Sequence, residues 1–267
     1  MALITDFEIN DTITSISSNA FNGLNSLECI ELPFIGYKID STNTFNYILG
    51  TVPSTLVSVK VTKDETIPTN AFKDCSSIES ITIPTTTKTI GSYAFYNCTS
   101  LEKLNSNTVG EINIPTAVWT ISSYVFYGCQ SITEITLSKD VTSIGEGAFY
   151  GCTNVERFNS NTDYTLVTPK CCESIGQYAF RNMSLITDVV INDTVTSIGN
   201  GALRGLNSLE SITLPFVGSS LNDTNSYTMT FGHIFGYYNS SNGGKTSNTS
   251  YSYTYQGYYY SFYIPTT

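Results

Sequence analysis

The side chains that most often carry out chemistry are few in this chain, and they do not form a catalytic constellation. The only histidine is His233. It aligns with Tyr47 when two similar segments of the chain are compared, which favours an aromatic packing position over general acid–base catalysis. The sequence has no phosphate-binding glycine loop, no zinc-ligand spacing and no Ser-His-Asp candidate. It therefore predicts a protein that is not an enzyme and that needs no cofactor.

The seven cysteines have a pattern that indicates packing more than redox chemistry. Four of them share one position, three residues after a phenylalanine: Cys75, Cys98, Cys129 and Cys152. Free cysteine behaves as a small buried hydrophobe, and an odd number at one repeating position disfavours a disulfide framework. Cys171 and Cys172 lie outside this pattern, and we expect them to be the most reactive pair. We expect no metal site there, because partner ligands are missing.

Carboxylates recur just after the first apolar residue of a short, strand-like phrase, at Glu28, Glu79, Glu102, Glu156 and Glu210, with Glu134 one place later. If the strands stack at ~4.8 Å, these carboxylates form a negative stripe beside a sheet. Such a stripe can be a solvated edge that maintains solubility, or it can attract a basic partner or cations. We take these six glutamates as candidate binding residues.

The elements that must position these residues are repeats of one apolar phrase, Ala-Phe or a close variant. It occurs seven times: Ala20-Phe21, Ala71-Phe72, Ala94-Phe95, Val125-Phe126, Ala148-Phe149, Ala179-Phe180 and Ala202-Leu203. From Phe72 to Leu203 the spacing alternates between 23 and 31 residues, which makes a super-repeat of 54 residues. A fixed phrase repeated in this way predicts a stacked solenoid.

Each repeat contains a candidate strand and, on the opposite side of the coil, a second apolar segment that carries the Ala-Phe phrase. Phrases such as Ile78-x-x-Ile81-x-Ile83-Pro84 alternate apolar residues and end at proline, which predicts a short strand. Stacking these strands gives a parallel sheet of about seven short strands. The seven Phe or Leu residues form a spine along the opposite wall. Tyrosines flank that spine and predict two aromatic columns, one of Tyr93, Tyr124 and Tyr178, the other of Tyr96, Tyr127 and Tyr150.

A second pattern is duplicated near both ends of the chain. The first copy is an inserted module at residues 34–55, after which Leu56 to Val61 alternate and predict a strand that returns to the sheet. The second copy is residues 216–267, and it stops where that strand should begin. We therefore expect the natural protein to continue into a further repeat. Residues 1–267 are interpreted as a single solenoid domain.

The second module carries a tyrosine-rich segment, residues 237–263, that the first lacks. Tyr251, Tyr253 and Tyr255 alternate, Gly257 offers a turn, and a second tyrosine run with Tyr259 follows, which predicts a hairpin. We take these four tyrosines as candidate binding residues, since so many tyrosines cannot all reach a core. The preceding residues from Asn239 to Ser250 have the composition of a flexible tip.

Composition narrows the class of partner. The net charge of −10 argues against nucleic acid and anionic membranes, because both need a basic surface. Only 13% of the residues are charged, so Ser, Thr and Asn supply most of the solvation, as is common on secreted surfaces. No stretch approaches the ~20 apolar residues of a membrane span, so we expect no membrane insertion. The first ten residues lack the pattern of a signal peptide.

The repeat pattern Ile-Gly-x-x-Ala-Phe-x-x-Cys-x-x-Leu-x-x-Ile-x-Ile-Pro resembles the BspA-like leucine-rich repeats, also called the Treponema pallidum type, over roughly residues 9–215. The resemblance implies a β-rich leucine-rich-repeat solenoid with the hairpin as an insert. It also implies a non-enzymatic binding scaffold, at the cell surface or outside the cell, that adheres to host or neighbouring-cell macromolecules.

Two other functions stay open. The first is a structural role, in which solenoids associate end to end into filaments or a surface layer, because similar modules lie near both ends and obvious caps are missing. The second is glycan binding by the tyrosines of the predicted hairpin. The partner is thus a protein or a glycan, and a repeat scaffold does not name its own ligand.

Overall fold

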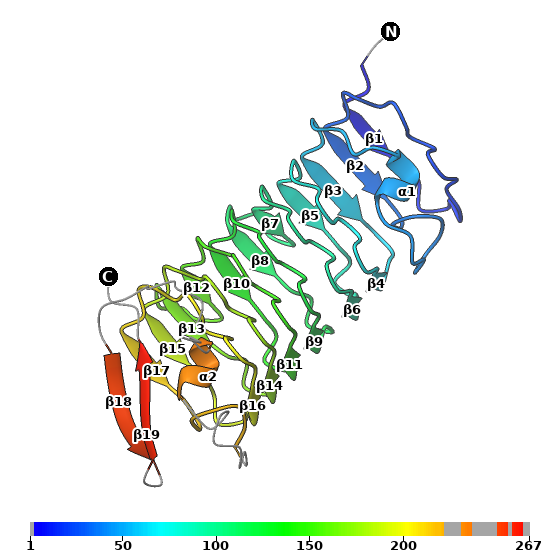
Figure 1. The fold of residues 1–267 in the computed structure, drawn as a ribbon. Helices are drawn as coiled ribbons and strands as arrows, with labels where there is room; N and C mark the ends of the chain where they lie inside the picture. Colours follow the sequence, from blue (N-terminus) through cyan, green and yellow to red (C-terminus); the bar gives the residue numbers. More distant parts are fainter. Residues whose placement is uncertain (1–2, 222–230, 237–249, 256–257, 264–267) are drawn as a thin grey trace.

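The computed structural model describes residues 3–221, 231–236, 250–255 and 258–263. Figure 1 shows a solenoid that runs from the N-terminal coils to the C-terminal coils, with strands stacked along one side. Each regular coil has three parts in chain order. A strand joins a long sheet, a two-residue edge strand follows, and a series of tight turns, which we call the wall, leads back to the sheet.

The long sheet is parallel throughout. Within the described residues it holds eleven strands, in the order β1 (Asp6–Glu8), β2 (Cys29–Leu32), β3 (Ser58–Val61), β5 (Ser80–Thr82), β7 (Lys103–Leu104), β8 (Glu111–Asn113), β10 (Glu134–Thr136), β12 (Arg157–Phe158), β13 (Thr165–Val167), β15 (Asp188–Val190) and β17 (Ser211–Thr213). The register aligns one apolar residue per strand, for example Ile81 with Leu104 and Leu104 with Ile112. This aligned row points into the core, because its members are almost all buried.

Short edge strands run along a second side of the solenoid. They form two groups, β4 (Thr66–Ile67) with β6 (Thr89–Ile90), and β9 (Thr120–Ile121), β11 (Ser143–Ile144), β14 (Ser174–Ile175) and β16 (Ser197–Ile198). Each has an isoleucine that is buried, such as Ile90 and Ile144. The isoleucine of the Ile-Gly step in the repeat phrase thus anchors the edge, and β-branched residues suit such a site.

The predicted fold class is confirmed, and the structure adds coils and strands to it. The solenoid has about nine coils instead of about seven. The long sheet, within the described part, has eleven strands instead of about seven. β3 is the returning strand that the alternation from Leu56 to Val61 predicts. β1 precedes the first repeat, and β8 and β13 lie in the two segments where the spacing lengthens from 23 to 31 residues.

Each of those lengthened segments adds a strand without adding a coil. Leu104 pairs with Ile112, and Phe158 pairs with Leu166, each eight residues further along the chain. A crossover between parallel strands normally takes a dozen or more residues, so these connections are unusually short. We call residues 105–110 and 159–164 the two short loops. They turn the chain back to the start of the next strand directly, without passing along the wall.

The phenylalanine spine is formed as the repeat predicts. Successive rings of Phe72, Phe95, Phe126, Phe149 and Phe180 lie 5.1–6.1 Å apart between centroids, with their planes within 14° of parallel. All five are buried, and Leu203 continues the row. Phe21 differs, because it is only partly buried and packs against Phe7, with ring centroids 5.0 Å apart.

The duplicated modules are themselves coils of the solenoid. The short helices α1 (Asn46–Leu49) and α2 (Phe231–Phe235) replace the tight turns of the wall. Phe45 packs on Phe72 with ring centroids 5.1 Å apart, so the first module extends the spine. Asn19 N–H donates to the carbonyl of Tyr47, and Gly201 N–H donates to that of His233, both at 2.8 Å. His233 and Tyr47 therefore occupy equivalent places, as their alignment predicts.

The cysteines of the described coils are free thiols. The thiols of Cys98, Cys129 and Cys152 each donate to the carbonyl of the spine phenylalanine one coil earlier, at 3.0–3.1 Å. Burial raises the pKa of Cys152 to about 12, which keeps it protonated. Cys171 is exposed, but Cys172 is buried, and desolvation raises its pKa to about 11. Of the two cysteines that we expected to be reactive, only Cys171 is therefore accessible.

The C-terminal hairpin is present as predicted. β18 (Ser250–Tyr255) and β19 (Tyr258–Tyr263) are antiparallel, with Tyr255 opposite Tyr258 at the turn. β19 lies against α2 (Figure 1). The side chains of Tyr251, Tyr253, Tyr255 and Tyr259 lie outside what the structure describes, and so does most of the predicted tip, residues 239–249.

Candidate functional site

The outer face of the long sheet carries the residues that alternate with the buried row. Because side chains in a strand point alternately to opposite faces, the residues on either side of each buried one face outward. At the first outward position the register aligns Asp6, Cys29, Ser58, Ser80, Lys103, Glu111, Glu134, Arg157, Thr165, Asp188 and Ser211. This row is mixed in charge, and apart from the buried Thr165 its members are not part of the core.

The predicted acidic stripe is broken up by the register. The positions just before the strands follow one another as Thr5, Glu28, Val57, Glu79, Glu102, Gly110, Thr133, Glu156, Tyr164, Thr187 and Glu210. Among the five glutamates of this row, Glu79 and Glu102 are direct neighbours, and Glu102 N–H donates to the carbonyl of Glu79 at 2.8 Å. The strand of the first module and the two short loops separate the others.

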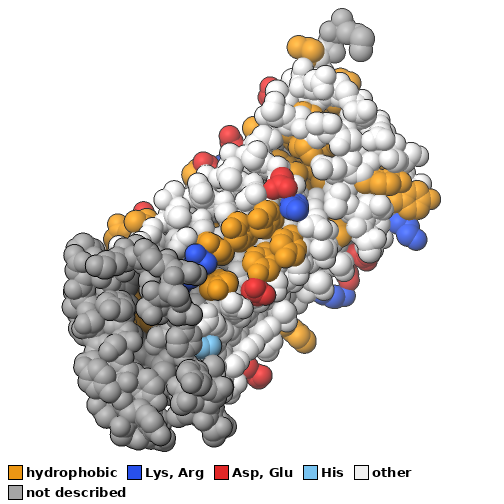
Figure 2. All heavy atoms as spheres, in the orientation of Figure 1, with side chains coloured by type: hydrophobic (Ala, Val, Ile, Leu, Met, Phe, Trp, Pro, Cys, Tyr) orange, Lys and Arg blue, Asp and Glu red, His pale blue; other side chains and the backbone are white. Residues whose placement is uncertain are grey.

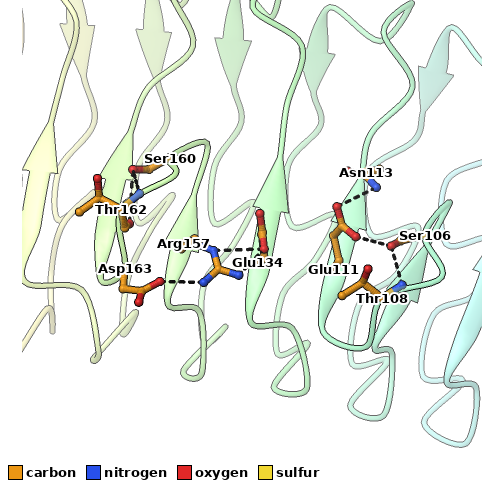
Figure 3. Close-up of polar contacts among 9 residues, drawn as sticks. All are labelled: Ser106, Thr108, Glu111, Asn113, Glu134, Arg157, Ser160, Thr162 and Asp163. Carbon is orange, nitrogen blue, oxygen red and sulfur yellow. Dashed lines mark hydrogen bonds and ion pairs between the residues drawn. The ribbon is translucent and has the colours of Figure 1, made fainter.

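Glu134, the sixth candidate, lies in the outward row, where it is paired with a cation. Arg157 donates to Glu134 Oε2 from Nη2 at 2.5 Å and from Nε at 3.1 Å. Its Nη1 donates to Asp163 of the second short loop at 2.7 Å (Figure 3). Hydrogen bonding to Glu134 is the main reason why the pKa of Arg157 is raised. Arg157 thus links β10 to the second short loop.

Glu111 is held in a similar way by the first short loop. The Ser106 hydroxyl donates to the Glu111 carboxylate, and Asn113 Nδ2 donates to it at 3.1 Å. These bonds, with that of Ser106 the stronger, lower the pKa of Glu111. Ser106 Oγ in turn accepts from Thr108 N–H at 3.0 Å (Figure 3). The carboxylate therefore stays ionised and fixed in direction at neutral pH.

The two short loops share one local structure. Asn105 and Asn159 both have positive φ, 52° and 53°, which asparagine tolerates better than most residues. Ser160 Oγ accepts from Thr162 N–H at 3.0 Å, as Ser106 does from Thr108 in the first loop. Figure 3 shows the two loops on either side of Glu134 and Arg157. The repeated Asn-Ser-Asn-Thr sequence therefore builds two similar projections on this face.

Sequence reasoning missed Arg157, Glu111, Asp163 and Ser106. A signal for the main ion pair was available, because Arg157 follows Glu134 by one repeat of 23 residues and so must be its neighbour in register. No such signal exists for Asp163 or Ser106. Their contacts depend on the course of the short loops, which the repeat does not specify.

A hollow lies near the N-terminal end of the same face. It is lined at β1, β2 and β3 by Asp6, Glu8, Cys29, Glu31, Ser58 and Lys60. Lys60 Nζ lies 2.8 Å from Glu31, so this cation is already paired. The remaining carboxylates of Asp6 and Glu8 make the hollow acidic.

In the described part of the chain, no three His, Cys, Asp or Glu side chains are placed to hold a metal ion. His233 is buried, with Nε2 3.2 Å from the carbonyl of Ile198, in the packing position that its alignment with Tyr47 predicts. No helix among the described residues has both the length and the apolar character that crossing a bilayer requires.

Comparisons with known proteins agree with the repeat. The family model described as "BspA type Leucine rich repeat region" matches residues 2–107, 65–171 and 105–223, in six copies. No curated protein matches the chain. Together the three matched ranges cover most of the chain, including nearly all of its regular coils.

Several solved structures are similar at low identity. The leucine-rich repeat protein of T. pallidum is 18% identical over 78% of this chain and 79% of that one, with a TM-score of 0.43. A leucine-rich cell surface protein from Faecalibacterium prausnitzii is 19% identical over 80% and 70%, with a TM-score of 0.34. The pneumococcal vaccine antigen PcpA is 20% identical over 79% and 60%, with a TM-score of 0.40. With its family match across most of its length and its coils built on the repeated Ala-Phe and Cys positions, the chain belongs to the BspA type leucine-rich repeat family.

Proposed function

We propose that this chain is a non-enzymatic binding scaffold, located at the cell surface or outside the cell, that adheres to macromolecules of a host or a neighbouring cell. Membership of a leucine-rich-repeat family supports the scaffold role. The low content of charged residues suits an extracellular surface. The partner class is a protein, since extended repeat surfaces bind partners that can span several coils.

The observation that carries this proposal is the outer face of the long sheet. Eleven strands in the described residues present a continuous surface that the core does not need. Carboxylates outnumber cations on it, as in the hollow with Asp6 and Glu8, and the neighbouring Glu79 and Glu102 add negative charge at the strand starts beside it. A negatively charged surface attracts a basic patch on a partner protein and raises the rate at which the two proteins associate. The partner is therefore a protein with a basic contact surface.

A cell-binding assay tests this function. Fluorescently labelled chain is added to cultured epithelial cells and to bacterial cells, and bound fluorescence is measured at physiological salt. The variant E79K/E102K reverses the two neighbouring carboxylates. The matched control is E173K/D193K, which makes the same change in charge at exposed residues away from the outer face.

We expect the chain to bind at least one cell type, E79K/E102K to lose most of that binding, and E173K/D193K to keep it. Equal loss in both variants would mean that net charge, not this face, controls binding. If the unmodified chain binds neither cell type, adhesion is the wrong function.

A structural role is the second candidate, and one observation favours it. Phe34 and Ile35 of the first module are fully buried, whereas the equivalent Phe216 is only partly buried and Val217 is 45% exposed. An exposed apolar end can pair with another solenoid. Light scattering over a concentration series, followed by negative-stain imaging, tests it. Linear growth that Val217→Asp abolishes would favour assembly over adhesion, and a monodisperse monomer would exclude it.

A further inference from the structure

The wall carries a second surface, on a different side of the solenoid from the outer face. Six half-buried tyrosines form what we call the tyrosine patch: Tyr93, Tyr96, Tyr124, Tyr127, Tyr150 and Tyr178. Tyr93 stacks on Tyr124 with centroids 5.0 Å apart, and Tyr96 stacks on Tyr127 at 4.6 Å. Figure 2 shows hydrophobic side chains, a class that includes tyrosine there, gathered at the centre of this face. The second predicted column is continuous from Tyr96 through Tyr127 to Tyr150, whereas in the first Tyr93 stacks on Tyr124 and Gly147 separates Tyr124 from Tyr178.

Three of these tyrosines occupy a backbone conformation that is unfavourable for them. Tyr93, Tyr124 and Tyr178 have φ of 60°, 57° and 56°. In the other regular coils the same position is held by the residues that tolerate positive φ best, namely Asn19, Asn70, Gly147 and Gly201. Packing of the wall therefore does not require tyrosine here. Residues that break a local rule in this way concentrate at functional sites.

Neighbouring coils make room for these rings. A Cβ added to Gly147 would lie 2.5 Å from Tyr124 Cε1, and one added to Gly201 would lie 2.7 Å from Tyr178 Cε1. The rings of Tyr124 and Tyr178 thus each lie over a glycine of the next coil, whereas Tyr93 stacks on Tyr124. The patch is a set of fitted side chains, not a chance cluster.

Cations lie at both ends of the patch. The Arg181 guanidinium carbon is 4.7 Å from the ring centroid of Tyr150 and 5.1 Å from that of Tyr178. At the other end, Lys73 Nζ is 5.4 Å from the centroid of Tyr96. Within the described residues neither cation has a carboxylate oxygen within 4.0 Å, although the chain carries a net charge of −10. Arg181 Nε is also buried without a hydrogen-bond partner.

The orientation of the rings adds to this preference for anions. The stacked pairs are within 13° of parallel, so one face of each of these four rings is covered by its partner. The edge of an aromatic ring carries partial positive charge. Sugars pack on ring faces, and stacking leaves fewer of these free, so the ring edges of the patch fit amide and carboxylate groups better.

We propose that the tyrosine patch is a second binding surface, and that its occupant is an extended, acidic segment of a partner protein. Tyrosine and arginine are the residues that most often dominate protein interfaces. The carboxylates of the segment pair with Lys73 and Arg181, and its backbone lies across the tyrosine hydroxyls. Glu146 accepts a hydrogen bond from the Tyr124 hydroxyl and fixes that ring.

The geometry sets the spacing of the two carboxylates. Lys73 and Arg181 are four coils apart, and successive coils are separated by 5.1–6.1 Å along the spine. An extended segment rises ~3.3 Å per residue, so about seven residues separate the two acidic positions.

Two synthetic peptides of identical composition test the proposal. Both contain two glutamates among serine, threonine and glycine, either seven positions apart or adjacent, and their affinities are measured by fluorescence anisotropy. The variant R181Q removes one cation, and Y93N replaces one strained tyrosine with the residue found at position 70. R157Q, on the outer face, is the matched control, and thermal unfolding verifies that each variant is folded.

We expect the peptide with spaced glutamates to bind more tightly than the other. R181Q should weaken it about tenfold, as expected for a charge-assisted hydrogen bond, Y93N should weaken it severalfold, and R157Q should leave it unchanged. Equal affinity for both peptides, or equal loss in R181Q and R157Q, overturns the proposal. Binding of polygalacturonate through Arg181, with no binding of either peptide, also overturns it in favour of an acidic glycan. Because R157Q reports on the other face, failure here leaves the adhesive function of the sheet untouched.

Discussion

Leu104 and Ile112 are partners in adjacent parallel strands although only eight residues separate them in the chain. The intervening short loop positions Ser106 on Glu111, and the second short loop positions Asp163 on Arg157. The charged groups at the centre of the outer face are therefore held by segments that interrupt the regular repeat.

Removing the first short loop should leave a folded solenoid. Deletion of residues 105–112 joins Leu104 to Asn113 and restores the apolar phrase that ends at Pro115, with a spacing of 23 residues. We expect cooperative thermal unfolding and an unchanged far-ultraviolet circular dichroism spectrum per residue. Loss of the cooperative transition would mean that β8 is indispensable to the sheet.

Asp64 should make stability depend on pH. It is fully buried, and its carboxylate accepts the Ile35 N–H at 2.5 Å and the Asp40 N–H at 2.8 Å. Desolvation raises its pKa from 3.8 to about 6, and the nearby Asp40 carboxylate adds to this. Since the folded state holds the proton more tightly than the unfolded state, this contribution to stability is complete below pH 4 and is lost as the pH rises through 6.

The difference amounts to about 2–3 kcal/mol. Urea unfolding at pH 4 and pH 7.5 measures it, and D64N should remove this part of the pH dependence while lowering stability at pH 4. An identical pH profile in the two proteins would contradict the assignment to Asp64.

The ion pair between Glu134 and Arg157 should stabilise the fold modestly. Their side chains are 26% and 33% exposed, and two hydrogen bonds join them. A double-mutant cycle with E134Q and R157Q should give a coupling of about 1 kcal/mol. Lys139 and Asp140 are the control, since this pair is 74% and 48% exposed and should show almost no coupling. Equal couplings for the two pairs would show that the geometry at Arg157 adds nothing.

Thiol labelling should distinguish Cys171 from the other cysteines. In the native protein a thiol reagent should react quickly with this exposed residue, while Cys129 and Cys152 react only after unfolding because burial raises the pKa of each thiol. The variant C171S should lose the fast phase. Cys29 is partly exposed and can also react, so the test for opening uses C29S/C171S: fast reaction of a thiol in this native variant would show that a buried coil opens readily.

The regular coils could be predicted from the sequence because one physical rule determines them. Phe95 and Phe126 share a phase of the repeat, and side chains in equivalent positions must stack when coils stack. The same rule places Tyr96 against Tyr127, and it correctly aligns His233 with Tyr47.

The candidate site was less predictable because it depends on register. Glu79 and Glu102 are neighbours, as the repeat implies, but Glu102 and Glu156 are separated by Gly110 and Thr133. A sequence pattern showed that eight residues were added before Phe126. It did not show that they return to the sheet as a strand, because connections this short are rare between parallel strands.

The two short loops also determine the shape of the solenoid. Between β5 and β15 the long sheet advances by six strand spacings, whereas from β6 to β16 the chain makes four steps along the edge strands of the described residues. The sheet side thus holds more strands than the edge side over the same coils, and we infer that this difference favours curvature with the sheet on the convex surface. Each short loop adds one strand to the sheet side and none to the edge side. Gain or loss of eight residues would therefore change the curvature of the sheet surface without changing the number of coils.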